Sequence, residues 1–167
     1  MTKIKNFVLK HPELFTILGL SILFYFIFFH NIWAYALMDV DESRYVSMSK
    51  DMFHTKDFLT LYLNKQFFFE KPPLYFWGEC LSFAFWGRVT EFTARFPVAL
   101  DGMLCCFTVY FLGKRIISRG YGVVSSLIFA TSLEFLILAK FAILDIVVAT
   151  DVAARGIDIE RISLVVN

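Results

Sequence analysis

Charged side chains capable of chemistry gather in two short stretches of the sequence. The first stretch holds Asp39, Asp41, Glu42, Arg44 and Tyr45. The second pairs Glu70 with Lys71 directly before a double proline. Carboxylates and cations are the side chains with which proteins move protons and hold anions. The local sequence does not decide the structural role of the acidic cluster. It suits either a solvated cap after one helix or the first turn of the next helix, where carboxylates are stabilised. Glu70 and Lys71 taken alone form an ordinary ion-pair candidate.

The combined pattern of motifs is more specific than either stretch. DVDESRY is followed by FFFEKPPLYFWG, with thirty residues between Asp41 and Lys71, and then by ARFPVAL and an aspartate after the third apolar segment. This order resembles the GT-C polyprenyl-phosphate-dependent glycosyltransferases, above all the protein O-mannosyltransferases and the lipid A aminoarabinose transferases. The resemblance covers residues 8–149. It implies an all-α, polytopic membrane protein that transfers a hexosyl or pentosyl group.

The resemblance also implies roles for three of these residues. Asp41 would be the catalytic carboxylate, acting as general base or positioner for the acceptor hydroxyl as it attacks the anomeric carbon. Lys71 would hold the phosphate of the lipid donor and offset the charge that builds on the leaving group. Tyr45 follows Asp41 by one helical turn, so both side chains can face one cavity.

Three further positions match the family with less defined roles. Glu70 matches a position that helps to bind a divalent metal in some relatives, with a partner ligand far downstream. Asp145 matches the second acidic position of the family, and Arg95 matches an arginine that either binds substrate or serves the structure alone. At each of these three positions, a purely structural role is the alternative to the functional one.

The composition independently favours a lipid environment. Hydrophobic residues make up 58% of the 167 residues, 21 of them Phe, and the mean hydropathy is +0.64. Soluble domains are about 45–50% apolar. The net charge of +1 gives no electrostatic support for nucleic-acid binding. The three cysteines, Cys80, Cys105 and Cys106, form no CxxC pair, and we interpret them as small apolar core residues.

Three apolar segments predict membrane spans. Residues 14–38 carry no Asp, Glu, Lys or Arg, and 25 helical residues are long enough to cross a hydrocarbon core of about 30 Å. This segment is too long for the apolar core of a signal peptide. The other predicted spans, residues 96–113 and 120–139, are interrupted only by Asp101 and Glu134. Intramembrane carboxylates usually face a protein interior. We interpret these two as energetically unfavourable residues without a role in the function.

Basic residues set the predicted topology. Lys3, Lys5 and Lys10 precede the first span, and Lys114, Arg115 and Arg119 lie in the tight turn between the second and third spans. The positive-inside rule places both segments in the cytoplasm. Residues 39–95 are then an extracytoplasmic loop of a multi-pass protein in the bacterial inner membrane, with a cytoplasmic N-terminus.

This loop is predicted to contain two amphipathic helices that lie in the membrane interface. In residues 40–53, Tyr45, Met48 and Met52 fall on one helical stripe. Residues 74–86 are rich in aromatic side chains but too short to span, and the prolines before them suit a helix start. A role in which both helices merely cap the membrane domain is the alternative.

The last residues change character. Residues 149–167, ATDVAARGIDIERISLVVN, carry charges where a fourth span is expected, and they resemble motif V of DEAD-box RNA helicases. The chain has no GxxxxGK[ST] loop and no DEAD box, so a helicase activity is not supported. We therefore divide the chain into a glycosyltransferase part, residues 1–149, and a foreign tail, residues 150–167. A chimeric reading frame explains this change best.

The function predicted from sequence is sugar transfer from a polyprenyl-phosphate donor, at the extracytoplasmic membrane face, to lipid A, a protein or another envelope glycan. Membrane lipids are expected partners and nucleic acid is not. We expect the chain alone to be inactive, because family members have about eleven to thirteen spans. The alternatives are a non-catalytic membrane module and, for the tail only, a helicase fragment.

Overall fold

A computed structural model describes residues 12–37, 41–64, 66–68, 71 and 73–142; of Asp41 it describes the backbone alone. Its regular elements within these residues are helices and one small hairpin. Its elements, in order, are α2 (Pro12–Phe29), α3 (Asp41–Thr55), β1 (Leu61–Leu63), β2 (Gln66–Phe68), α4 (Leu74–Trp86), α5 (Glu91–Ile116), α6 (Arg119–Ala130) and α7 (Leu133–Leu138).

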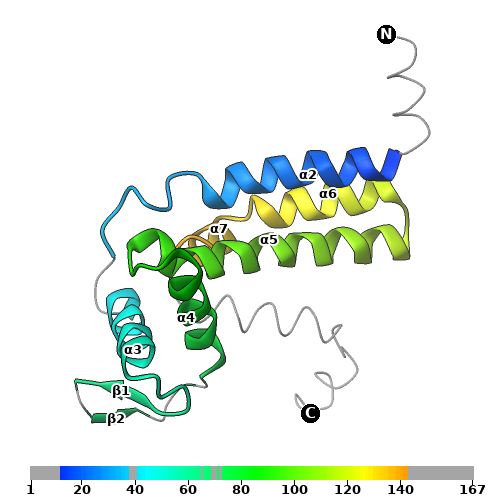
Figure 1. Ribbon diagram of the computed structural model, residues 1–167. Helices are drawn as coiled ribbons and strands as arrows, with labels where there is room; N and C mark the ends of the chain where they lie inside the picture. The colour runs from blue at the N-terminus through cyan, green and yellow to red at the C-terminus, as the bar shows by residue number, and fades with distance from the viewer. Residues whose placement is uncertain (1–11, 38–40, 65, 69–70, 72, 143–167) are drawn as a thin grey trace, which may run out of the picture.

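Three helices, α2, α5 and α6, lie side by side as a layer of rods, while α3, α4 and the hairpin gather at one end of this layer (Figure 1). An ion pair between Glu13 and Lys114 joins the start of α2 to the end of α5. The basic turn between α5 and α6 therefore lies at the end of the rods opposite to α3 and α4. This arrangement agrees with the predicted topology, in which the basic turn and the charged loop lie on opposite sides of the membrane.

Two of the described helices are long and apolar enough to cross a membrane, α2 with 18 residues and α5 with 26. At 1.5 Å per residue they extend about 27 and 39 Å. A capping box starts α5, because the Thr90 side chain accepts from the Thr93 backbone while the Thr93 side chain accepts from the Thr90 backbone. Long apolar helices thus lie where the first two spans were predicted, although their bounds differ, and that they cross a membrane stays a prediction.

Aromatic rings and small residues fill the space between the rods. Phe24 of α2 meets Phe107 of α5 edge to face, with ring centroids 5.4 Å apart. Between α5 and α6 the backbones approach closely at Gly113 and Gly122, where a Cβ on Gly122 would lie 2.5 Å from the Tyr110 carbonyl oxygen. Close packing of this kind holds membrane helices together, because lipid supplies no hydrophobic driving force between them.

The first apolar run extends beyond its helix. Residues 14–38 were predicted as one span, but α2 ends at Phe29, and Asn31 takes a left-handed backbone with φ 63°. The remaining apolar residues form a turn and a loop that is drawn toward α5 by contacts described below. Hydropathy does not distinguish this apolar loop from a continuing helix, so the predicted C-terminal bound was wrong.

The third predicted span is not a single helix. Residues 120–139 divide into α6, with 12 residues, and the short α7, separated by Thr131 and Ser132. The Thr131 hydroxyl donates to the carbonyl of Leu127, and such side-chain bonds compete with the continuing helix. At about 18 Å, α6 is shorter than a hydrocarbon core of about 30 Å. The prediction of one helix over these residues was therefore wrong.

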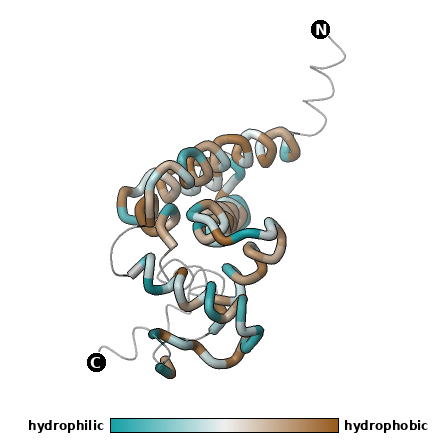
Figure 2. Tube along the Cα trace, turned by 60° about the vertical axis from the view of Figure 1, so that its left-hand side comes forward, coloured by the Kyte–Doolittle hydropathy of each residue, from teal (hydrophilic) through white to brown (hydrophobic). Residues whose placement is uncertain are grey.

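Helices are present at both positions where loop helices were predicted. Their bounds are close to the predicted ones for α3 and identical for α4, which starts directly after Pro73. Tyr45, Met48 and Met52 are buried as the helical stripe predicted. The hairpin of β1 and β2, paired antiparallel with Leu61 opposite Phe68, was not predicted. Figure 2 shows hydrophilic segments concentrated around α3 and the turns, and hydrophobic ones along the rods.

Helix α4 carries apolar residues on both of its faces. Phe76 and Phe83 are buried together with Glu79, whereas Leu81 and Phe85 are 72% and 81% exposed. A surface helix of a soluble protein usually exposes a polar face instead. The exposed apolar face is consistent with a position against lipid or other protein, and its placement in the membrane interface stays a prediction.

Candidate functional site

A buried arginine ties the start of α3 to the rods. Arg95, in the second turn of α5, is 1% exposed and forms a two-pronged ion pair with Glu42, Nε to Oε1 at 2.7 Å and Nη2 to Oε2 at 2.9 Å. Glu42 is equally buried. Paired planar contacts of this kind fix orientation as well as adding energy. Since Glu42 adjoins Asp41, the ion pair fixes the end of α3 at which Asp41 lies.

The same guanidinium also binds the backbone of the loop that follows α2. Its Nη1 donates to the carbonyls of Ile32 and Tyr35, both at 2.8 Å, and its Nη2 donates to the carbonyl of Ala36 at 3.0 Å. The backbone N–H of Ala142 donates to Glu42 Oε1 at 2.9 Å. We call these contacts of Arg95 and Glu42 the arginine clamp. It joins the loop after α2 and the start of α3 to α5 and to the backbone at Ala142.

The clamp bears on the predicted role of Arg95. All of its nitrogen atoms donate to protein groups, which favours the structural role over contact with a substrate. The clamp also explains the end of α2, since carbonyls drawn to Arg95 cannot continue a helix. Sequence reasoning noted Glu42 but missed its pairing with Arg95, because the two residues are 53 positions apart.

Contacts between α3 and α4 follow a constant offset of thirty residues. Tyr45 meets Tyr75, with ring centroids 6.1 Å apart. One turn later Ser49 bonds to Glu79, and after another turn Phe53 meets Phe83, with centroids 6.0 Å apart. Both helices therefore run in the same direction along this contact. We call these three pairs the α3–α4 ladder.

Asp41 and Lys71 fall one step before the first pair of the ladder. Asp41 is the first residue of α3, which resolves the ambiguity of the acidic cluster in favour of a helix start. Lys71 lies in a bend ahead of α4, and its side chain is half-buried. In the described part of the chain, no hydrogen bond or ion pair involves the Lys71 ammonium group. The predicted pair of Asp41 and Lys71 thus has the same thirty-residue offset as the contacts of the ladder.

The remaining predicted residues lie in different situations. Tyr45 is buried, with its ring packed on Tyr75 and Phe76, so its visible role is structural. Glu70 and Asp145 lie outside the described residues. No three His, Cys, Asp or Glu side chains within the described ranges lie close enough together to hold a metal ion. A metal role for Glu70 therefore stays a prediction.

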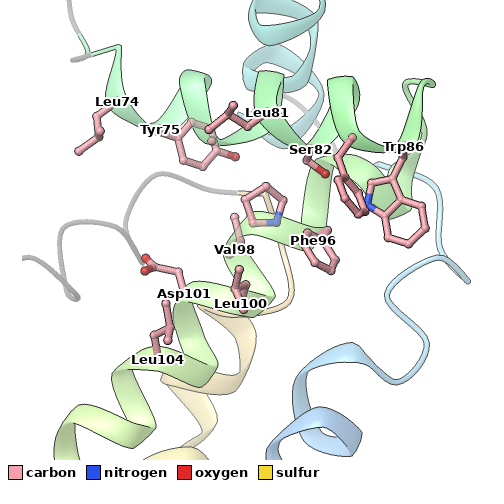
Figure 3. Close-up of a pocket in the computed structure, with 13 residues that line it drawn as sticks. Leu74, Tyr75, Leu81, Ser82, Trp86, Phe96, Val98, Leu100, Asp101 and Leu104 are labelled. Atoms are coloured by element: carbon pink, nitrogen blue, oxygen red, sulfur yellow. The ribbon is translucent and has the colours of Figure 1, made fainter.

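An apolar cavity of about 580 Å³ opens between α4 and the first turns of α5 (Figure 3). Leu74, Leu81 and Trp86 line it from α4, and Leu100 and Leu104 line it from α5. Asp101, which sequence reasoning treated as an intramembrane cost, is half-buried at the edge of this cavity. The cavity begins at Leu74, three residues after Lys71, and its lining suits a hydrocarbon chain.

Comparison with known proteins agrees with this arrangement. A family profile described as dolichyl-phosphate-mannose-protein mannosyltransferase matches residues 13–154. The match ends a few residues beyond the predicted boundary at residue 149. Residues 143–167 lie outside the described part of the chain, so the helicase-like tail stays a prediction.

Relatives by sequence include transferases that use an undecaprenyl-phosphate sugar. The chain is 29% identical over 120 residues to undecaprenyl phosphate-alpha-4-amino-4-deoxy-L-arabinose arabinosyl transferase 2 of Sodalis glossinidius, which covers 71% of this chain and 22% of the relative. A protein of Wigglesworthia glossinidia brevipalpis with the corresponding name is 27% identical over 80% of this chain and 23% of its own. An uncharacterized protein of Aquifex aeolicus is 35% identical over 64% of this chain and 25% of its own length.

Among solved structures, the chain is similar to ArnT from Cupriavidus metallidurans in the apo state and bound to undecaprenyl phosphate. Both comparisons give a TM-score of 0.77 at 25% sequence identity, covering 82% of this chain and 25% of ArnT. The chain thus spans about a quarter of the length of the proteins it matches.

Proposed function

The chain belongs to the dolichyl-phosphate-mannose-protein mannosyltransferase family, and we propose that it supplies the donor-phosphate face of a membrane glycosyltransferase. The donor is a sugar linked to a polyprenyl phosphate, as the names of the arabinosyl transferase relatives and the undecaprenyl phosphate bound to ArnT suggest. The ladder supports this proposal, because Asp41 and Lys71 share the thirty-residue offset of its three contacts.

The proposed reaction divides its work between these two residues. The acceptor oxygen attacks the anomeric carbon of the donor sugar, and the bond from that carbon to the phosphate oxygen breaks. The bonding electrons leave with the polyprenyl phosphate, and the acceptor proton passes to the carboxylate of Asp41. The Lys71 ammonium offsets the charge that builds on the departing phosphate. A divalent metal held by Glu70 and a distant ligand is a further part of this proposal.

The surroundings of the two residues fit such a donor. Its polyprenyl chain requires an apolar environment, and its phosphosugar requires polar groups at the membrane face. The exposed face of α4 and the cavity between α4 and α5 supply apolar surface beside Lys71. The charged start of α3, held by the arginine clamp, supplies the polar side. Asp145, a few residues beyond the clamp contact at Ala142, is proposed to complete it.

The finer assignments follow from the relatives. We propose a pentosyl group of the aminoarabinose type as the sugar, an acceptor among lipid A, protein and envelope glycans, and an active face outside the bacterial inner membrane. The N-terminus is then cytoplasmic, in agreement with the basic turn at that end of the rods. Because the chain spans about a quarter of its relatives, we expect it to bind the donor but not to complete transfer alone.

Binding of undecaprenyl phosphate tests this proposal on the chain itself. The chain is placed in lipid nanodiscs, and its affinity for undecaprenyl phosphate is measured for the unchanged protein, Lys71→Ala and the control Lys50→Ala, whose side chain is exposed on α3. Loss of a charge-assisted phosphate contact should weaken binding about 10–100-fold. The control should bind normally. Equal binding by Lys71→Ala and the unchanged protein would remove Lys71 from the site.

Transfer requires the rest of a relative. In a hybrid, residues 13–142 replace the matching segment of the Cupriavidus ArnT, and sugar transfer from the undecaprenyl-phosphate donor is measured. Asp41→Asn should lower transfer about 10²–10⁴-fold with donor binding retained. Asp51→Asn, an exposed aspartate on the same helix, is the matched control. Full transfer by the Asp41→Asn hybrid would contradict the proposed role of this residue.

A further inference from the structure

Glu79 is a carboxylic acid in the centre of the α3–α4 ladder. Its side chain is fully buried, and Ser49 Oγ donates to its Oε2 while Tyr75 Oη donates to its Oε1 at 2.8 Å. The next residue of α4, Cys80, donates from Sγ to the Ser49 carbonyl at 3.4 Å. The polar step of the ladder therefore joins adjacent residues of α4 to one residue of α3, between two aromatic steps.

The charged groups around Glu79 do not favour its ionised form. Burial raises the pKa of the Glu79 carboxyl to about 8, an effect that the bonds from Ser49 and Tyr75 only partly offset and that nearby Glu42 reinforces. Burial and Glu79 together hold the pKa of Tyr75 well above its usual value, and they raise that of Cys80 to about 11. The titratable groups facing this region are Glu42 and Tyr45 of α3, Tyr75 and Cys80 of α4, Lys56 after α3, and Arg95 of α5, which pairs with Glu42.

Neither of the cations in this set compensates a charge on Glu79. Arg95 is paired with Glu42, and Lys56 lies over the ring of Phe53, 4.1 Å from its centroid. Among the residues that the structure describes, ionised Glu79 would thus have no cationic partner, and such a buried carboxylate is costly. The neutral acid keeps both hydrogen bonds, because the Ser49 hydroxyl can accept as well as donate. Burial of the carboxyl group between α3 and α4 therefore favours the neutral form, which retains both hydrogen bonds.

We propose that Glu79 is a positioning residue for the reaction, holding α3 and α4 in a register that would bring Asp41 and Lys71 to the same donor phosphosugar. This inference rests on the proposed function, and it adds that the donor-phosphate face responds to pH through a residue that does not touch the donor. Two helical turns separate Ser49 from Asp41 on α3, and eight residues separate Glu79 from Lys71, so a shift at the centre of the ladder moves both ends.

The first experiment measures undecaprenyl-phosphate binding in nanodiscs between pH 6.5 and pH 9.5. If only the neutral form of Glu79 is competent, the affinity of the unchanged chain should fall about 30-fold by pH 9.5, given the pKa of about 8. Glu79→Gln keeps a neutral group that can bond to Ser49 and Tyr75, and it should abolish this fall. The exposed Glu134→Gln is the control and should behave as the unchanged chain.

The comparison of variants isolates Glu79 from other titrations. Ionisation of the donor phosphate, at about pH 6, affects all variants equally. A parallel fall in the unchanged chain and in Glu79→Gln would overturn the positioning role while leaving the proposed function intact. Failure of every variant to bind at pH 6.5 would instead contradict the proposed function.

A second measurement tests the register without a ligand. Spin labels are attached at Ser47→Cys on α3 and Leu81→Cys on α4, both exposed positions, and the distance between them is measured. The distribution should be narrow at pH 6.5 and should broaden or shift above pH 8 in the otherwise unchanged chain. With Glu79→Gln added it should stay narrow at every pH. An unchanged distribution across this range in both proteins would overturn the proposal.

Discussion

The rods and the layer at their end are held together by different physical means. Between α2, α5 and α6 the contacts are aromatic rings and close backbone approach at glycine. Between α3, α4 and α5 the decisive contacts are buried and polar, namely the arginine clamp and the bonds of Glu79. Apolar packing tolerates small shifts, whereas paired charges and hydrogen bonds specify one geometry. The chain thus places its directional contacts where we propose that the chemistry occurs.

The largest effect should come from breaking the clamp. Arg95→Ala leaves Glu42 buried without its cation, and the free energy of unfolding should fall by about 3–5 kcal/mol. Thermal unfolding in detergent, followed by tryptophan fluorescence, measures this loss. The exposed Arg88→Ala is the control and should change stability little. A loss no greater than that of the control would show that the clamp does not hold the layer to the rods.

Raising the pH should weaken the same layer by another route. The Glu79 carboxyl has a folded-state pKa of about 8, against an ordinary value of 4.5. The contribution of Glu79 to the free energy of unfolding is therefore complete below about pH 4.5. It decreases as the pH rises from there to about 8. The decrease should be a few kcal/mol, at about 1.4 kcal/mol for each unit of pKa difference.

Unfolding measured from pH 5 to pH 8.5 checks this pH dependence. The unchanged chain should lose stability relative to Glu79→Gln over this range, and the two should run parallel above pH 8.5. A difference between them that does not vary with pH would mean that Glu79 does not titrate as the buried environment requires.

Within the rods, size rather than charge should matter. A Cβ at Gly122 would lie 2.5 Å from the Tyr110 carbonyl oxygen and 2.9 Å from the Lys114 backbone nitrogen, so Gly122→Ala should destabilise the chain by about 1–3 kcal/mol. Gly19 has no atom within 4 Å of such a Cβ, and Gly19→Ala is the control. It should be neutral or stabilise α2 by up to about 1 kcal/mol, since alanine is the better helix former. Equal effects at both positions would contradict the close contact of α5 and α6.

The smallest effect should come from the ion pair at the far end of the rods. Glu13 and Lys114 are 48% and 33% exposed at their side chains. Exposed pairs contribute about 0–1 kcal/mol and are screened by salt. Glu13→Gln should therefore change stability by less than about 1 kcal/mol, and the difference should vanish at 1 M salt. A larger loss of stability that persists in salt would show that this exposed pair contributes to stability in the way that the buried arginine clamp does.

Several features followed from the sequence alone. Long apolar runs located α2 and α5, the second of them interrupted only by Asp101, and the period of apolar residues located α3 with its buried Tyr45, Met48 and Met52. The double proline marked the start of α4. The spacing of the charged motifs pointed to the family that the later comparison supports. All these signals are local or follow from covalent order, so they need no knowledge of which segments meet in space.

Other features depended on contacts between distant residues. Arg95 and Glu42 are 53 positions apart, and nothing in either segment announces that they pair, or that the loop after α2 contributes three carbonyls. In the sequence, Glu79 only interrupts an apolar segment. Its role becomes apparent from the structure, where Ser49 and Tyr75 are its hydrogen-bond partners. The sequence determined which residues are available to the donor-phosphate face. Only the tertiary structure decided which charges are paired with each other, because pairing depends on distance and burial rather than on residue order.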